Sequence, residues 1–233
     1  MPSSTRRLVH SATSVPPNRR FYGLDLGHRQ DHSALAALDL AWTPAGRCPV
    51  TFGFLFDPAL QIRHLSRFPL GTPYEQLYRL LEQAIPPRAH QQLVIDAGGP
   101  GLPVIERLRV SLGERTQIKP VVITGGMASN HLSGGFTSVP RKALISNIQL
   151  LLAARSLHCE RDLPGVDRLR DELLGLSAGN SQPVSGQAHD DLAIAVALAA
   201  WQAVHDAPEL LPETEESQRA RRLPSLYGPG RLF

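Results

Sequence analysis

The chain has 233 residues, 42% of them hydrophobic, which suits one domain with a sizeable core. Its net charge of +3 is mild and permits a nucleic-acid partner without requiring one. Cys48 and Cys159 lie outside any metal-ligand spacing, and the apolar run 192–201 is too short for a bilayer, which needs about 20 residues. Composition thus argues against a disulfide framework, a structural zinc site and a membrane span. Because nothing resembles a secretory signal, we expect a soluble, cytoplasmic protein.

The two ends of the chain differ from its middle. Residues 1–20 mix Ser, Thr, Pro and Arg without apolar periodicity, which predicts a disordered or extended lead-in. Residues 207–233 contain an acidic patch, an arginine cluster and a Pro/Gly-rich end, which predict a flexible tail. A single domain is expected over 21–206.

The first part of this domain has the pattern of a β-meander. Short apolar runs at 21–26, 33–42 and 50–56 predict three strands, separated by turn signals at Gly27 and at 44–46. Their close spacing favours antiparallel pairing.

Strands and helices alternate in the rest of the domain. Helical spacing predicts helices over 74–85, 103–110 and 166–174, and apolar runs predict strands over 92–96 and 119–124. The glycine-rich range 125–137 predicts a mobile loop, and a helix opens after Ser138. The range 190–204 is apolar nearly all round, which predicts a helix buried against a sheet. The fold class expected is α/β, a mixed central sheet with a three-strand antiparallel meander plus parallel strands, flanked by helices.

Aspartates stand where buried elements meet the surface. Asp25 ends the first predicted strand, Asp96 ends a parallel-type strand, and Asp190 with Asp191 begins the buried helix. Sites in open α/β sheets gather at the carboxyl ends of strands, so these side chains are expected to converge. Grouped carboxylates need a compensating cation, and oxygen ligands suit Mg²⁺ or Mn²⁺. Two such ions would support phosphoryl transfer.

Each aspartate also has a purely structural interpretation. Asp25 would shape a turn, Asp96 would cap the following helix, and Asp190 with Asp191 would cap the buried helix by accepting hydrogen bonds from its free amides. The residues alone leave both interpretations open.

Five motifs together resemble the nuclease domain of tailed-phage terminase large subunits. The likeness covers about residues 21–204 and follows the order of the family. The motifs are Gly23-Leu-Asp-Leu-Gly with Asp31 six residues after Asp25, Val94-Ile-Asp-Ala-Gly-Gly-Pro-Gly, Val122-Ile-Thr-Gly-Gly, Val139-Pro-Arg-Lys-Ala-Leu-Ile and His189-Asp-Asp-Leu-Ala-Ile-Ala.

The resemblance implies a ribonuclease-H-like core and an endonuclease that uses two Mg²⁺ or Mn²⁺ ions during genome packaging. It places Asp25, Asp96 and Asp191 on the acidic triad of the family, with Asp31 and Asp190 as auxiliary ligands. The partners it implies are double-stranded DNA, a terminase ATPase motor, the small terminase subunit and the portal, in the host bacterial cytoplasm. The chain lacks the G-x-x-x-x-G-K-[ST] motif of that motor, so we expect an excised nuclease domain or a free-standing relative.

We expect auxiliary roles for three other polar residues. His189 beside the aspartates would orient water or assist a metal ligand, with a solvent-exposed histidine as the alternative. Arg141 and Lys142 at a predicted helix start would contact DNA phosphates, with a solvated face as the alternative. The adjacent loops lack interleaved aromatic residues, which favours duplex over single-stranded substrate.

Three other functional classes share features of this sequence. A Holliday-junction resolvase or transposase core would use the same chemistry. A non-catalytic DNA-binding or assembly module would keep the fold, but the three carboxylate positions are intact. An actin-like or sugar-kinase ATP-binding fold also places Asp-x-Gly after a strand, yet it needs two lobes, for which this chain is too short.

Overall fold

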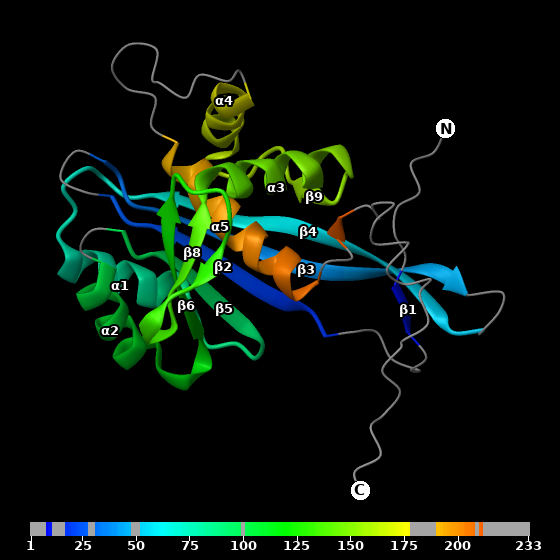
Figure 1. Ribbon diagram of the computed structural model, residues 1–233, viewed down its shortest axis with the longest axis horizontal. Helices are drawn as coiled ribbons and strands as arrows, with labels where there is room; N and C mark the ends of the chain where they lie inside the picture. Colours follow the sequence, from blue (N-terminus) through cyan, green and yellow to red (C-terminus); the bar gives the residue numbers. More distant parts are fainter. Residues whose placement is uncertain are drawn as a thin grey trace, which may run out of the picture.

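One mixed β-sheet runs through the protein and carries helices on both faces (Figure 1). The structure is a computed structural model, and it describes residues 8–10, 17–27, 31–47, 52–98, 101–177, 190–207 and 210–211. Within these residues the sheet has nine strands in the order β1-β4-β3-β2-β5-β6-β8-β7, with β9 beside β4. The strands are β1 (Leu8–His10), β2 (Arg19–Asp25), β3 (Ala34–Arg47), β4 (Phe54–Arg67), β5 (Gln91–Asp96), β6 (Gln117–Thr124), β7 (Asn130–His131), β8 (Thr137–Pro140) and β9 (Leu157–Cys159). The helices are α1 (Tyr74–Ala84), α2 (Gly101–Leu112), η1 (Gly113–Arg115), η2 (Ser133–Gly135), α3 (Arg141–Ala153), α4 (Val166–Ser177) and α5 (Asp191–Asp206).

Strands β2, β3 and β4 form the antiparallel meander that the sequence predicts. The prediction of a strand over 50–56 is wrong in extent, because β4 begins at Phe54 and continues to Arg67. Since β4 is antiparallel to β3 and β3 to β2, β4 runs in the same direction as β2. Its last residue therefore lies at the same edge of the sheet as Asp25, and Asp25, Ala34 and Arg67 are register partners across the three strands.

The turn predicted at 44–46 is also wrong, because these residues lie inside β3. The pairing with β4 shifts register between Pro44 and Gly46, which marks a β-bulge. Gly46 has a φ of +125°, a conformation that side chains with a Cβ rarely adopt. Gly46 therefore marks a bulge within one long strand and not a turn between two strands.

The other half of the sheet is parallel. Strand β5 lies beside β2, β6 beside β5 and β8 beside β6. Helix α2 crosses from β5 to β6, as a parallel pair requires. The order β4-β3-β2-β5-β6, antiparallel on one side of β2 and parallel on the other, is that of a ribonuclease-H-like core. The expected fold class is confirmed.

The range 125–137, which its glycines predict to be a mobile loop, includes short regular elements. It contains β7 and the short helix η2, and β7 pairs antiparallel with β8 through the register pairs Asn130 with Ser138 and His131 with Thr137. Two glycines of η2, Gly134 and Gly135, have positive φ and allow the chain to reverse there. Strands β8 and β9, which the sequence analysis did not predict, are short, with four and three residues.

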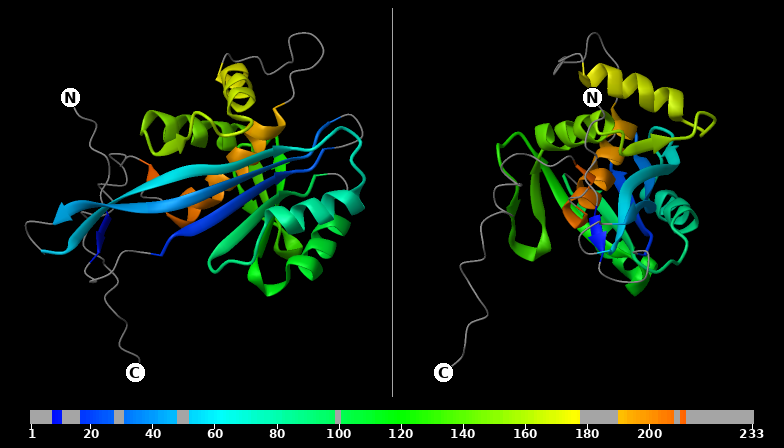
Figure 2. Two further views of the ribbon diagram at one scale, coloured as in Figure 1. Left: turned by 180° about the vertical axis from the view of Figure 1, so that it is seen from behind. Right: turned by 90° about the vertical axis from the view of Figure 1, so that its right-hand side faces the viewer.

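Helices cover the two faces of the sheet as separate layers (Figure 2). Helices α1 and α2 pack on one face, in a core cluster that includes Tyr22, Leu24 and Ile95. Helices α3, α4 and α5 cover the other, where most of α5 is buried in a cluster with Phe21 and Val94. The predicted buried helix over 190–204 is confirmed and ends slightly later, at Asp206.

A close approach between α5 and β2 explains the small residues in both. A Cβ placed on Gly23 would lie 1.9 Å from the carbonyl oxygen of Ala195, so only glycine fits in the middle of β2. Ala199 makes the next backbone contact along the helix. The helix backbone thus rests on the strand, with its N-terminus toward Asp25.

The described elements extend slightly beyond the expected domain limits of 21 and 206. Strand β1, within the expected lead-in, pairs with β4, and β2 begins at Arg19. Ala207 and Leu210, in the expected tail, are 3% and 1% exposed. Within the described residues, no helix combines the length and the apolar character that a membrane span requires.

Candidate active site

The ends of two neighbouring parallel strands place the first two aspartates side by side. Asp25 is the last residue of β2 and Asp96 the last of β5, and the residues just before them, Leu24 and Ile95, are register partners. The residues just before each aspartate, 21–24 in β2 and 93–95 in β5, are buried and apart from Gly23 hydrophobic, so both carboxylates lie at the carboxyl edge of the sheet.

The N-terminus of α5 brings two more aspartates to this edge. Burial first, and then the negative charges of Asp96, Asp191 and Asp190, raise the pKa of Asp25 well above its usual value. Arg141 opposes this rise. The charges of Asp96, Asp191 and Asp190 all act on the Asp25 carboxyl, so the four aspartates lie in one neighbourhood at this edge of the sheet. Their convergence on one shared site stays a prediction.

Two arginines hold the aspartates of α5. The Nε of Arg67 donates to Oδ2 of Asp191 at 2.9 Å, and the side chains are only 14% and 8% exposed. Arg141 forms an ion pair with Asp190. The second guanidinium nitrogen of Arg67, Nη2, is buried and has no hydrogen-bond partner within the described residues. Guanidinium groups thus supply part of the positive charge that a carboxylate cluster needs, at the two aspartates of α5.

Asp96 is held by the loop that follows it. Its Oδ1 accepts a hydrogen bond of 2.9 Å from the amide of Gly98, and a Cβ on Gly98 would lie 3.2 Å from that oxygen. The alternative role of Asp96, capping the following helix, does not fit this bond, because α2 begins only at Gly101.

The capping interpretation of Asp190 does not fit either. Asp190 occupies the N-cap position of α5, yet its side chain makes no capping hydrogen bond. Glu172 of α4 accepts the hydrogen bond from the amide of Ala193 instead, at 2.9 Å. Burial, together with the charges of Asp191 and Asp190, raises the pKa of Glu172 to about 7, although the Ala193 amide and Arg67 act in the opposite direction.

A scan of the sequence against protein-family models gives no match, and a search among curated proteins gives none. Among solved structures, the chain is similar to the large terminase nuclease from thermophilic phage G20c. A crystal structure of that protein with bound zinc is 22% identical in sequence, with a TM-score of 0.45, and the match covers 84% of this chain and 88% of that chain. A second structure of the same nuclease is 21% identical, with a TM-score of 0.48 and the same coverage. Both are nucleases of the kind that the five motifs resemble, and the likeness concerns the fold.

Other predicted site residues lie at the margin of the cluster or outside the described chain. Asp31 is exposed and follows Gly27 across residues 28–30, which the structure does not describe. Lys142 is exposed in the first turn of α3, next to Arg141. His189 lies outside the described residues.

The donor chemistry of the cluster fits a divalent cation of the Mg²⁺ or Mn²⁺ type. Asp25, Asp96 and Asp191 offer only carboxylate oxygens, and burial followed by the charges of the neighbouring aspartates raises the pKa of Asp25. No three His, Cys, Asp or Glu side chains among the described residues already form a group that would hold an ion. The carboxylates of Asp191 and Asp190 instead pair with Arg67 and Arg141. A cation would take over these oxygens from the guanidinium groups.

Sequence reasoning missed two residues of the site, Arg67 and Glu172. Arg67 was missed because the predicted strand 50–56 stopped short of the edge where Asp25 lies. The signal that would have found it is the apolar alternation of β4, whose buried positions continue to Leu65. Glu172 has no comparable signal, because its contact depends on how α4 crosses the start of α5.

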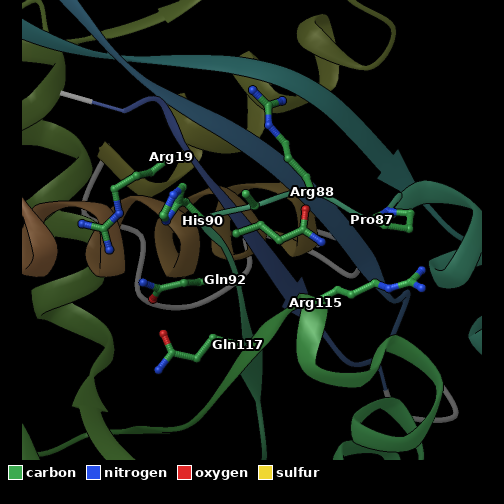
Figure 3. A pocket seen from close by; sticks show the side chains of 9 residues that line it. Arg19, Pro87, Arg88, His90, Gln92, Arg115 and Gln117 are labelled. Atoms are coloured by element: carbon green, nitrogen blue, oxygen red, sulfur yellow. The ribbon is translucent and has the colours of Figure 1, made fainter. Parts of the chain in front are cut away.

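A cavity of about 610 Å³ lies at the amino ends of the central strands, away from the aspartates at their carboxyl ends (Figure 3). It is lined at the amino ends of the strands by Arg19, Arg88, His90, Arg115 and neighbouring residues, and none of the clustered aspartates takes part. Two of these arginines form ion pairs, Arg19 with Asp206 and Arg88 with Asp39. The cavity is therefore separate from the carboxylate cluster.

Proposed function

We propose that the protein is a metal-dependent endonuclease that hydrolyses phosphodiester bonds of double-stranded DNA at the carboxyl edge of its sheet. The observation that carries this proposal is the position of Asp25. A buried carboxylate facing Asp96, Asp190 and Asp191 is unfavourable unless positive charge arrives. The sequence motifs around these residues, which resemble terminase nucleases, support the same conclusion.

Asp25, Asp96 and Asp191 would hold the ions, with Asp190 and Asp31 as auxiliary ligands. When bound, two Mg²⁺ or Mn²⁺ ions supply a nucleophile at neutral pH and stabilise charge on the leaving oxygen. Asp25 would have to be in its carboxylate form to bind a cation, and its raised pKa means that metal binding competes with a proton there. The Gly98 amide holds Oδ1 of Asp96, and Oδ2 would serve as the ligand.

The substrate contacts would come from the same edge. Once Asp190 turns toward a cation, Arg141 becomes free to contact a DNA phosphate, and Lys142 is already exposed beside it. His189, which precedes Asp190 in the sequence, would orient water there. The motifs further support a role in genome packaging with a terminase ATPase motor, and the sequence of cleaved sites is left to experiment.

The proposal is tested by nicking of supercoiled plasmid with Mn²⁺, Mg²⁺ or EDTA. Wild-type protein should nick with either ion and be inactive in EDTA, and Asp25→Asn and Asp96→Asn should each abolish cleavage. Asp167→Asn is a matched control, because Asp167 is 82% exposed on α4 and pairs only with Arg170 among the described residues. Its activity should equal that of the wild type. Wild-type protein that does not nick in Mn²⁺, or that nicks equally well in EDTA, would contradict the proposal and favour a non-catalytic DNA-binding module.

A further inference from the structure

The first turn of α5 is capped by a side chain from another helix. An N-cap residue ordinarily accepts a hydrogen bond from the second or third amide of its own helix, which in α5 belong to Leu192 and Ala193. Asp190 does not do so, and its carboxylate forms an ion pair with Arg141. Oε2 of Glu172 takes the Ala193 amide at 2.9 Å. Glu172 thus occupies the position that the side chain of Asp190 would otherwise fill.

Because Glu172 accepts from the Ala193 amide in place of Asp190, a third carboxyl group lies near Asp190 and Asp191, where its negative charge is unfavourable. Asp190 and Asp191 both repel the Glu172 carboxylate, and Arg67 is the positive charge that offsets them. The other oxygen of Glu172, Oε1, is buried without a hydrogen-bond partner in the described part of the chain. Burial of Oε1 without a partner carries a desolvation cost that a solvent-exposed cap of the same helix would not carry.

We propose that Glu172 is a positioning residue of the nuclease site, which caps α5 from α4 so that the carboxylate of Asp190 stays available to the cluster. The inference rests on the proposed function and assigns Glu172 no contact with substrate or metal. With the Ala193 amide occupied, one of the two amides that would draw Asp190 back to its own helix is taken, and the Asp190 carboxylate pairs with Arg141. The same bond fixes the first turn of α5, and therefore the backbone that carries Asp191.

Two substitutions of Glu172 test its charge and its hydrogen-bond acceptor separately. Glu172→Gln keeps a carbonyl oxygen that can accept from Ala193 but removes the charge. Glu172→Ala removes the acceptor, so that Asp190 is expected to turn back and cap its own helix. Asp171→Ala is the matched control, because it removes a carboxylate from the next position of α4, where Asp171 is 71% exposed.

The first measurement is independent of catalysis. Amide hydrogen exchange at Ala193 in metal-free protein should be unchanged in Glu172→Gln and Asp171→Ala. In Glu172→Ala the Ala193 amide should remain protected only if Asp190 replaces the lost acceptor, and a further Asp190→Ala change should then expose it. Protection of Ala193 at the wild-type level in both Glu172→Ala and the double variant would overturn the capping role.

The second measurement concerns the metal and the reaction. Loss of residues that orient metal ligands commonly weakens metal affinity or activity by about 10- to 100-fold. We therefore expect Mn²⁺ titration calorimetry to show about a tenfold weaker Kd for Glu172→Ala, and nicking to show a lower kcat with the KM for DNA unchanged. Glu172→Gln should stay within about threefold of the wild type. Wild-type Mn²⁺ affinity and kcat in Glu172→Ala, or equal losses in the Ala and Gln variants, would overturn the proposal. If the wild type binds Mn²⁺ but does not nick DNA, the proposed function fails, while the exchange and calorimetry results still decide the role of Glu172.

Discussion

Asp191 and Arg67 stand 124 positions apart in the sequence and form an ion pair of 2.9 Å at the edge of the sheet. Both side chains are largely buried, so neither can exchange its partner for bulk water. Arg67 neutralises a carboxylate that the proposed function assigns to a metal ion. The pair stabilises the metal-free protein, and a cation that binds Asp191 has to compete with Arg67 for its carboxylate.

Removing Arg67 should therefore destabilise the metal-free protein and increase its response to metal. Breaking one side of a buried ion pair costs about 3–5 kcal/mol. In a protein of this size each kcal/mol lowers the melting temperature by roughly 2–4 °C. We expect Arg67→Ala to melt well below the wild type in EDTA, and Mn²⁺ to raise its melting temperature by more than it raises that of the wild type.

Arg63→Ala is the control for this prediction. Arg63 lies on the same strand but is 46% exposed, and its pairs with Asp39 and Glu160 measure 3.5 and 3.2 Å. Exposed pairs contribute about 0–1 kcal/mol, so this variant should melt close to the wild type with or without metal. If Arg67→Ala melts at the wild-type temperature in EDTA, the buried pair does not have the role assigned to it.

Substitution of Asp25 should move stability and activity in opposite directions. The raised pKa of Asp25 means that its contribution to stability is complete below about pH 4 and is lost as the pH rises through the folded-state value. At neutral pH in EDTA, Asp25→Asn removes this penalty and should melt at or above the wild-type temperature. It should also lose the metal stabilisation, which at one hundred times the dissociation constant is about 2.7 kcal/mol. A lower melting temperature in EDTA, combined with wild-type nicking in Mn²⁺, would show that Asp25 is a structural residue.

The difference between what could and could not be predicted at this site has a physical cause. Asp25, Asp96 and Asp191 were predictable because each ends or begins an element with strong apolar periodicity, and parallel strand ends meet at one edge. Arg67 depends on how far β4 extends, and strand boundaries follow pairing with β3 more than local composition. Glu172 depends on the crossing of two helices, which the local sequence does not encode. The bulge at Gly46 was mistaken for a turn because glycine signals both.

Arg141 and Lys142 should contribute to the salt dependence of DNA binding. Each lies in the first turn of α3, beside the aspartate cluster, and Arg141 is held by Asp190 in the absence of metal. Changing both to alanine should flatten the plot of log K against log salt by roughly one to two units of slope, measured with Ca²⁺ to prevent cleavage. Arg79→Ala, an exposed arginine on α1 on the opposite face of the sheet, should leave the slope unchanged. An unaltered slope in the double variant would show that Arg141 and Lys142 are solvent-exposed residues that do not contact DNA phosphates.

Glu172 should make the stability of the metal-free protein depend on pH. Its pKa is raised from an ordinary value of 4.5 to about 7, mainly by burial, so the folded protein holds this proton more tightly than the unfolded chain. The associated stability is complete below about pH 4.5 and is lost as the pH rises through about 7. Glu172→Gln keeps the acceptor for Ala193 and cannot ionise. Its melting temperature minus that of the wild type, measured in EDTA, should therefore increase between pH 4.5 and 7.5, by on the order of a few degrees. The partial exposure of the side chain limits the size of this increase. Because both proteins contain Asp25, its own pH dependence largely cancels in the difference. A difference that stays constant across this range would mean that Glu172 is already ionised in the folded protein at low pH, and that Arg67 outweighs burial at this position.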